Sequence, residues 1–182
     1  TVVPVMSQAA WERGIRVISA FDYFSESTAE GAIAIAMQEL PVTIDGVEAA
    51  VIGYGRIGEL LGEKLRALGA HVTVLARRAE QITRAETRHH SVERLVSDHG
   101  SFSPRSLAGY RVVFNTVPQR IVTKEVLQTV RRDCVLIDLA SAPGGIDLSA
   151  AREMGLCGVW GTALPGKVAP ESAGEILAQS VN

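Results

Sequence analysis

The chain has 182 residues, of which 47% are hydrophobic and 21% are charged, and its formal net charge is −2. This composition is typical of one globular domain with a full core, and it excludes a disordered chain or one with a long apolar membrane-spanning segment. Lysine and arginine residues are spread along the sequence without a basic arm, so we expect no nucleic-acid partner and no membrane partner.

The two cysteines, Cys134 and Cys157, lie inside apolar stretches and lack the spacing of a metal-ligand pair or a disulfide scaffold. We therefore expect buried free thiols and no metal site. The sequence does not open with a signal peptide, and a reducing cytoplasm is consistent with these features.

Residues 1–24 are interpreted as the remnant of a preceding N-terminal domain. The chain starts without methionine, inside a strand-like run at residues 1–5, so we expect a further N-terminal region. Residues 25–182 are expected to form the main domain. Ser27 and Glu30 have the spacing of a capping box, and the apolar residues that follow predict a connecting helix over residues 28–40.

Strand-like and helix-like segments alternate through the main domain, which is typical of an α/β fold with a mostly parallel sheet. Six strands are predicted, at residues 47–52, 71–76, 90–92, 112–117, 135–139 and 156–160. Helices are predicted at residues 56–68, 79–86, 124–131 (after a Thr123 cap), 148–154 and from Pro170 onward, with a helical turn at 104–107 capped by Ser103. Crossover helices between six parallel strands predict a doubly wound Rossmann sheet of strand order 3-2-1-4-5-6.

A GxGxxG motif stands at the junction of the first predicted strand and helix of this domain. It consists of Gly53, Tyr54, Gly55, Arg56, Ile57 and Gly58. In this context the first glycine permits a tight turn, the second lets the backbone approach a diphosphate, and the third lets the helix pack on the sheet. The motif predicts a dinucleotide site with the diphosphate at the positive end of the helix, the alternative being a glycine-rich turn without a ligand.

The end of the second strand indicates which dinucleotide is bound. NAD enzymes usually place a carboxylate there to bind the ribose 2′-hydroxyl, whereas this chain has Ala76, Arg77 and Arg78. Two guanidinium groups favour a 2′-phosphate, so the sequence predicts NADP(H), unless both arginines are only solvated at a strand end.

Ligands of open α/β sheets lie beyond the carboxyl ends of the strands, near the switch in strand order. This rule selects residues 115–118, 138–145 and 161–166. Within them the predicted cofactor-binding residues are Asn115, Thr116, Val117, Pro118, Leu139, Ala140 and Ser141. Asp138 is interpreted either as part of this site or only as the cap of the next turn. Residues 161–167 spell GxxxxGK, but Val168 stands where a nucleoside-triphosphate loop needs serine or threonine, so that function is discounted.

Taken together, the glycine motif, the strand ends and the segments at 138–145 and 164–170 resemble the A subunit of dipicolinate synthase. The similarity runs from about Phe24 to the C-terminus, and the last two segments carry most of its specificity. The resemblance implies that a dihydrodipicolinate-type intermediate is oxidised with NADP⁺ to the pyridine dicarboxylate of bacterial spores. It also implies a partner, which is a flavoprotein-like B subunit, and it implies an N-terminal domain that is largely absent here.

A substrate with two carboxylates requires cationic or hydroxyl donors. Our candidates are Arg120, Ser141, Lys167 and the helix start at residues 25–28, while no residue is indicated as the general base. The sequence does not decide whether the protein forms a homo-oligomer.

Two alternatives remain at this point. A D-2-hydroxyacid dehydrogenase would need a histidine acid/base near the nicotinamide, and residues 115–182 contain no histidine. A regulatory or assembly module that binds a nucleotide without chemistry of its own fits the shortage of titratable residues at the strand ends.

Overall fold

The structure, a computed structural model, describes residues 8, 12–14, 24–98 and 101–181. The interpretation of residues 1–24 as the remnant of another domain therefore lies almost entirely outside the described residues. None of the helices in the described ranges is long and apolar enough to cross a membrane.

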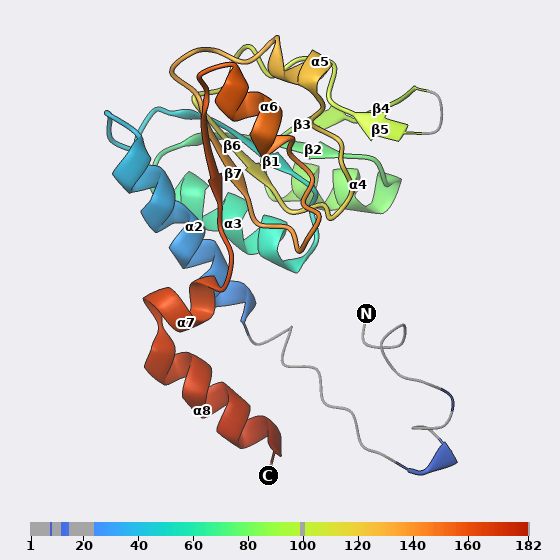
Figure 1. The fold of residues 1–182 in the computed structure, drawn as a ribbon, viewed down its shortest axis with the longest axis vertical. Helices are drawn as coiled ribbons and strands as arrows, with labels where there is room; N and C mark the ends of the chain where they lie inside the picture. The colour runs from blue at the N-terminus through green and yellow to red at the C-terminus, as the bar shows by residue number, and fades with distance from the viewer. Residues whose placement is uncertain (1–7, 9–11, 15–23, 99–100, 182) are drawn as a thin grey trace.

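A six-stranded parallel sheet forms the centre of the fold (Figure 1). Its strands are β1 (Glu48–Ile52), β2 (His71–Ala76), β3 (Ser91–Arg94), β6 (Val112–Asn115), β7 (Val135–Asp138) and β8 (Cys157–Trp160). They are ordered β3-β2-β1-β6-β7-β8, which is the predicted order 3-2-1-4-5-6. The strand order reverses between β1 and β6, and in such sheets the crevice at this point is where ligands bind.

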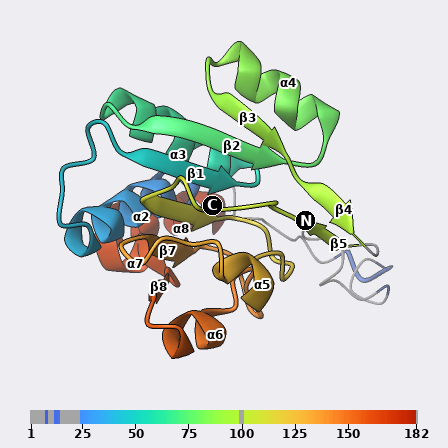
Figure 2. The ribbon, with the colours of Figure 1, turned by 90° about the horizontal axis from the view of Figure 1, so that it is seen from above.

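Helices cover both faces of the sheet, as in a doubly wound fold (Figure 2). The helices are α2 (Ser25–Glu39), α3 (Arg56–Ala67), α4 (Ala79–Thr87), α5 (Lys124–Leu127), α6 (Leu148–Glu153), α7 (Leu164–Val168) and α8 (Pro170–Val181). Strand β1 shows why both faces are covered, because Ala49 and Val51 pack into one core while Ala50 and Ile52 pack into the other.

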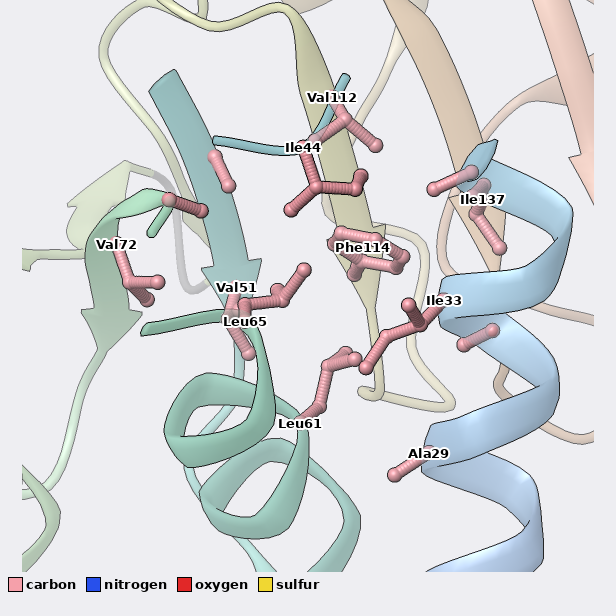
Figure 3. Packing of buried hydrophobic residues seen from close by; sticks show 14 of the residues in the cluster. Ala29, Ile33, Ile44, Val51, Leu61, Leu65, Val72, Val112, Phe114 and Ile137 are labelled. Carbon is pink, nitrogen blue, oxygen red and sulfur yellow. The ribbon is translucent and has the colours of Figure 1, made fainter. Parts of the chain in front are cut away.

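The first core lies between the sheet and helices α2 and α3. Leu61 and Leu65, one helical turn apart on α3, and Ile33 of α2 point toward Val51 and Phe114 of the sheet (Figure 3). The second core lies on the opposite face, where α5 and α6 pack, and includes Leu127 and Ala151. Together the two cores fix the strand ends that carry the candidate site.

Helix α2 begins three residues earlier than predicted, and the capping box is wrong. Its N-cap is Phe24, and no side chain caps the helix. The Ser27 and Thr28 hydroxyls instead donate hydrogen bonds back to the Phe24 carbonyl, 3.3 and 2.7 Å away. Both residues lie inside the first turns, where a hydroxyl commonly bonds to a preceding carbonyl.

The predicted helical turn at residues 104–107 is also wrong. Two short antiparallel strands, β4 (Val96–Asp98) and β5 (Ser101–Ser103), precede this segment, so Ser103 ends a strand instead of capping a helix. The Leu107 amide donates to Thr129 Oγ1 at 2.8 Å, and this contact with the segment after α5 replaces a local turn. Helix α5 ends at Leu127, four residues before the predicted end.

Two smaller differences concern the C-terminal part of the chain. Residues 164–168, which precede the last predicted helix, form the short helix α7, which packs against α2. Cys134 is a buried free thiol as predicted, whereas the free thiol of Cys157, at the start of the edge strand β8, is only half-buried.

Candidate functional site

The glycine turn between β1 and α3 is closely packed at its first and last glycines. Gly53 has a φ of +88°, and a Cβ at this position would lie 2.5 Å from Thr116 Oγ1. A Cβ at Gly58 would overlap the carbonyl oxygen of Gly53. Both positions therefore require glycine, because a side chain would push the turn away from β6 or from α3.

The middle glycine is different, because it borders open space. A Cβ on Gly55 would meet no atom within 4 Å, and Gly55 is also the N-cap of α3. No side chain caps this helix, whose first hydrogen bond runs from Glu59 N to Gly55 O at 2.8 Å. The amides of the first helical turn are thus available to an anion, where the helix dipole is positive.

A first cavity of about 500 Å³ lies over the switch point of the sheet. It is lined by the ends of three strands, at residues 53–55 after β1, 76–78 at the end of β2 and 116–119 after β6, together with Gln81, Leu95 and Ile121. This arrangement combines the glycine turn with the two predicted arginines in one concave surface. None of the described residues that line it is acidic.

The two arginines at the end of β2 both line the first cavity and are exposed. Arg78 Nη1 lies 3.7 Å from Glu80 Oε1, which is a loose contact between exposed side chains. The guanidinium groups of Arg77 and Arg78 therefore give this end of the cavity a positive charge without a lining carboxylate.

A second cavity of about 340 Å³ adjoins the first and shares Thr116 and Pro118 with it. Its walls come from the segments after β7 and β8, at residues 139–141 and 161–165, and from Thr28 and Ile57. Its polar side chains are the hydroxyls of Thr28, Thr116, Ser141 and Thr162, and no titratable side chain lines it among the described residues. This cavity can donate hydrogen bonds to a ligand but offers no group for proton transfer.

Asp138 is buried below the segment that follows β7 and is 1% exposed. Its Oδ1 accepts hydrogen bonds from Asn115 Nδ2 and Ala140 N, at 2.8 and 3.1 Å. Its Oδ2 accepts hydrogen bonds from Gly145 N and Ile146 N, both at 2.8 Å. The carboxylate therefore holds the turn at residues 139–146, which agrees with the interpretation of Asp138 as a cap.

Asn115 is the corresponding residue at the end of β6. Its side-chain amide donates to Asp138 Oδ1 and Val117 O, and its Oδ1 accepts from Val117 N at 3.1 Å. Asn115 is fully buried and lines neither cavity. It positions Thr116 to Pro118, the ridge between the two cavities, from below.

The structure does not bring all the predicted substrate residues together. Ser141 lines the second cavity, but Arg120 lines neither cavity and pairs with Asp147, with Nη1 2.8 Å from Oδ2. Lys167 is exposed on helix α7 and also lines neither cavity. Of the predicted helix start at residues 25–28, Thr28 reaches the second cavity.

Four residues that the sequence did not indicate also line the first cavity, namely Gln81, Leu95, Gln119 and Ile121. Thr162, which lines the second cavity, lies in the segment 161–166 that the strand ends indicated. Gln81 lies on α4 and Leu95 lies after β3, and no local motif marks them.

Trp160, at the end of β8, lies beside the second cavity. Its Nε1 donates a 3.0 Å hydrogen bond to the carbonyl of Ala140, a residue of the cavity wall, while the side chain stays 42% exposed. The indole thus ties the ends of β7 and β8 together.

Tyr54, the residue between the first two glycines, has a fully buried ring. The ring contacts the His90 imidazole edge-on, with 5.8 Å between ring centroids. Burial raises the pKa of Tyr54, and burial, followed by the nearby positive charge of Arg66, lowers the pKa of His90. Both side chains are therefore neutral near pH 7, and they support the glycine turn from behind.

The described part of the chain contains no group of three or more histidine, cysteine, aspartate or glutamate side chains that could hold a metal ion. The candidate site therefore consists of backbone amides, hydroxyls and two arginines around two adjoining cavities.

Comparison with known proteins shows which proteins the chain resembles. Residues 40–149 match the model of a family described as "Putative NAD(P)-binding". The chain is 36% identical over 156 residues to the A subunit of dipicolinate synthase of Bacillus subtilis (strain 168), a match that covers 86% of this chain and 51% of the relative.

Two solved structures are similar over most of the chain. The crystal structure of the A subunit of dipicolinate synthase from Bacillus halodurans matches with a TM-score of 0.82 and 36% identity, over 89% of this chain and 54% of that one. The A chain of dipicolinate synthase from Bacillus subtilis matches with a TM-score of 0.82 and 30% identity, over 97% of this chain and 61% of that one. The chain thus spans between half and two thirds of the length of these relatives.

Proposed function

The chain belongs to the family of the dipicolinate synthase A subunit, and on this premise we propose that it binds NADP(H) and forms the cofactor-binding part of an oxidoreductase. One observation carries the choice of cofactor. The first cavity joins an uncapped helix N-terminus to two arginines and has no acidic residue in its described lining. An NAD site would need an acceptor for the ribose 2′-hydroxyl at the end of β2, and Ala76 to Arg78 offer none.

The residues present fit such a cofactor. The diphosphate would lie against Gly55 and the first turn of α3, where a Cβ would occupy free space. The 2′-phosphate would contact Arg77 and Arg78, and the adenosine would lie between them and Thr116 to Pro118. The nicotinamide end would reach the second cavity near Leu139 to Ser141.

The proposed reaction is the oxidation of a dihydrodipicolinate-type intermediate to dipicolinate. NADP⁺, when bound, would supply the hydride acceptor, and one proton would be released as the ring becomes aromatic. The Ser141 and Thr162 hydroxyls would bind the carboxylates of the substrate in the second cavity. Because no titratable side chain of the described residues lines this cavity, we assign the proton acceptor to a part of the protein outside them.

The proposal extends to a partner, because the name of the Bacillus subtilis (strain 168) relative describes it as one subunit of dipicolinate synthase. We propose that the partner is a B subunit, which is flavoprotein-like as the family resemblance implies. We also propose a role in making the dipicolinate of bacterial spores.

The two cavities share Thr116 and Pro118, and this supports a ligand that extends through both cavities.

Titration with NADP⁺ and NAD⁺ tests the cofactor. We expect tighter binding of NADP⁺, and the double substitution Arg77→Ala and Arg78→Ala should weaken NADP⁺ by about 100-fold, because each arginine loses a charge-assisted hydrogen bond. NAD⁺ binding should change by less than about threefold. Arg152→Ala, an exposed arginine of α6, is the control. Tighter binding of NAD⁺ than of NADP⁺ by the unaltered chain would contradict the assignment.

A second candidate function, a nucleotide-binding module without chemistry, is favoured by the lack of a titratable side chain in the described wall of the second cavity. Incubation with the proposed intermediate and NADP⁺, with and without the B subunit, separates the two functions through the absorbance of reduced nicotinamide. NADPH formation supports the enzyme. Retained NADP⁺ binding with no turnover in either mixture favours the module.

A further inference from the structure

Arg84 connects helix α4 to the glycine turn although 30 residues separate it from Tyr54. Its Nη2 donates a 3.0 Å hydrogen bond to the Tyr54 carbonyl oxygen, between the first two glycines of the motif. Its guanidinium carbon also lies 5.9 Å from the centroid of the Tyr54 ring. Arg84 lines neither cavity, so these contacts act on the turn from behind.

The bond to the Tyr54 carbonyl fixes the direction of the next amide. A trans peptide is planar, and its C=O and N–H point in opposite directions. Because the Tyr54 oxygen is bound to Arg84, the Gly55 N–H points away from Arg84, and Gly55 lines the first cavity. A rotation of this peptide by half a turn would replace that N–H with a carbonyl oxygen, which repels a diphosphate.

The peptide needs such a lock because its second residue is glycine, which adopts positive and negative φ values at similar cost. The Tyr54 ring cannot follow a rotation easily, since it is fully buried against His90. The Arg84 hydrogen bond is the additional contact that favours one orientation of the carbonyl itself.

Arg84 is itself held in place by α3. Glu59, 19% exposed on its side chain, lies 3.5 Å from Arg84 Nε and 2.6 Å from Arg88 Nη2, and Arg88 also pairs with Glu63. Arg84 of α4 and Arg88, the C-cap of the same helix, thus meet two glutamates one turn apart on α3. The helix that follows the Arg77 and Arg78 segment is in this way attached to the helix that follows the glycine turn.

We propose that Arg84 is a positioning residue for the diphosphate of the dinucleotide. It keeps the peptide between Tyr54 and Gly55 oriented with the N–H toward the ligand, and it does so without touching the ligand. The inference rests on the proposed function, because it assumes that the glycine turn binds a dinucleotide.

The test compares three ligands on the unaltered chain and on Arg84→Met. NADP⁺ and NAD⁺ contain the diphosphate, whereas adenosine 2′-monophosphate carries the 2′-phosphate alone. We expect Arg84→Met to weaken NADP⁺ and NAD⁺ by the same factor, about tenfold, and to leave adenosine 2′-monophosphate within about twofold. Arg84→Lys should recover most of the loss, because its ammonium group can donate to the Tyr54 oxygen.

Arg88→Met is the matched control. Arg88 is the C-cap of the same helix and pairs with the same glutamate, Glu59, but it makes no hydrogen bond to Tyr54. It should leave all three affinities unchanged. Arg84→Gln repeats the comparison should Arg84→Met not fold.

Other outcomes overturn the inference. If Arg84→Met weakens the binding of NADP⁺ and adenosine 2′-monophosphate but not of NAD⁺, Arg84 contacts the 2′-phosphate directly. Equal losses for all three ligands, or none, leave it a purely structural residue. If the unaltered chain binds neither dinucleotide, the proposed function itself fails, which is distinct from binding that Arg84→Met does not change.

Discussion

Asn115 and Asp138 are paired across strands β6 and β7, and Asn115 Nδ2 donates a 2.8 Å hydrogen bond to Asp138 Oδ1. Each residue also holds the backbone that follows its own strand, at Val117 and at Ala140. The ridge between the two cavities and the far wall of the second cavity therefore depend on one buried polar pair.

Replacing Asp138 with asparagine should destabilise the fold. All four groups around the carboxylate are donors, so an asparagine amide would place its own N–H₂ against two of them. Losing charge-assisted bonds and leaving buried donors unpaired costs roughly 3 kcal/mol of unfolding free energy, measurable by urea denaturation. Asp147→Asn, at the N-cap of α6, is the control and should cost about 1 kcal/mol or less. Equal effects of the two substitutions would contradict the role of Asp138.

Alanine at the two later glycines of the motif should differ in its effect on stability. Gly55→Ala adds a methyl group in open space at a φ of −85°, so the unfolding free energy should stay within about 0.5 kcal/mol while dinucleotide binding weakens at least tenfold. Gly58→Ala overlaps the Gly53 carbonyl, so it should lower both stability and binding. Thermal unfolding and NADP⁺ titration of both variants check this. A stable Gly58→Ala with normal binding would show that the helix can move away from the turn.

Stability should fall with acidification because of His90. The imidazole is buried, both ring nitrogens lack a hydrogen-bond partner among the described residues, and burial lowers its pKa below the ordinary 6.5. The unfolded chain therefore binds this proton more readily than the folded chain. The contribution of neutral His90 to the unfolding free energy is complete above pH 6.5 and is lost as the pH falls toward the lower pKa of the folded state. The slope from one histidine cannot exceed about 1.4 kcal/mol per pH unit.

Urea denaturation at pH 7.5 and 5.5 measures this contribution. His90→Phe should lose less stability between the two values than the unaltered chain, whereas His89→Asn, which changes the exposed neighbour, should behave like the unaltered chain. Identical pH dependence of His90→Phe and the unaltered chain would mean that His90 takes up its proton equally well in both states.

The two thiols should differ in reactivity. Burial raises the pKa of Cys134 to about 12, and burial followed by the charge of Glu39 raises the pKa of Cys157. At pH 8 only about 10⁻⁴ of Cys134 would be thiolate, so a disulfide reagent should modify Cys157 first and Cys134 only after unfolding. The Cys157→Ser variant isolates Cys134, and rapid labelling of that variant in the folded state would contradict its burial.

The order of the sheet could be predicted from the sequence because the strands other than β3 are compact, mostly apolar runs and each connection is long enough for a crossover helix. The glycine motif could be recognised in the same way, since its three glycines lie in one continuous segment with the strand and the helix. In both cases the information lies within a short window of sequence.

The missing parts depend on local patterns that are ambiguous or too short, or on contacts between distant residues. The hydroxyl of Ser27 has the spacing of a cap, but Phe24 supplies the acceptor it uses. The strands β4 and β5 have three residues each, too few for a periodic pattern. Arg84 bonds to Tyr54, 30 residues away, and Arg120 forms an ion pair with Asp147 instead of lining a cavity. Neither role can be recognised from a local motif.

Trp160 gives this fold an optical reporter. Its indole is bonded to Ala140 in the wall of the second cavity, and the chain contains only one other tryptophan, Trp11. With Trp11 replaced by phenylalanine, the emission of Trp160 would follow the polarity of its surroundings, and a reduced nicotinamide nearby would quench it. The filling of the second cavity could then be watched by fluorescence in real time, without an attached dye.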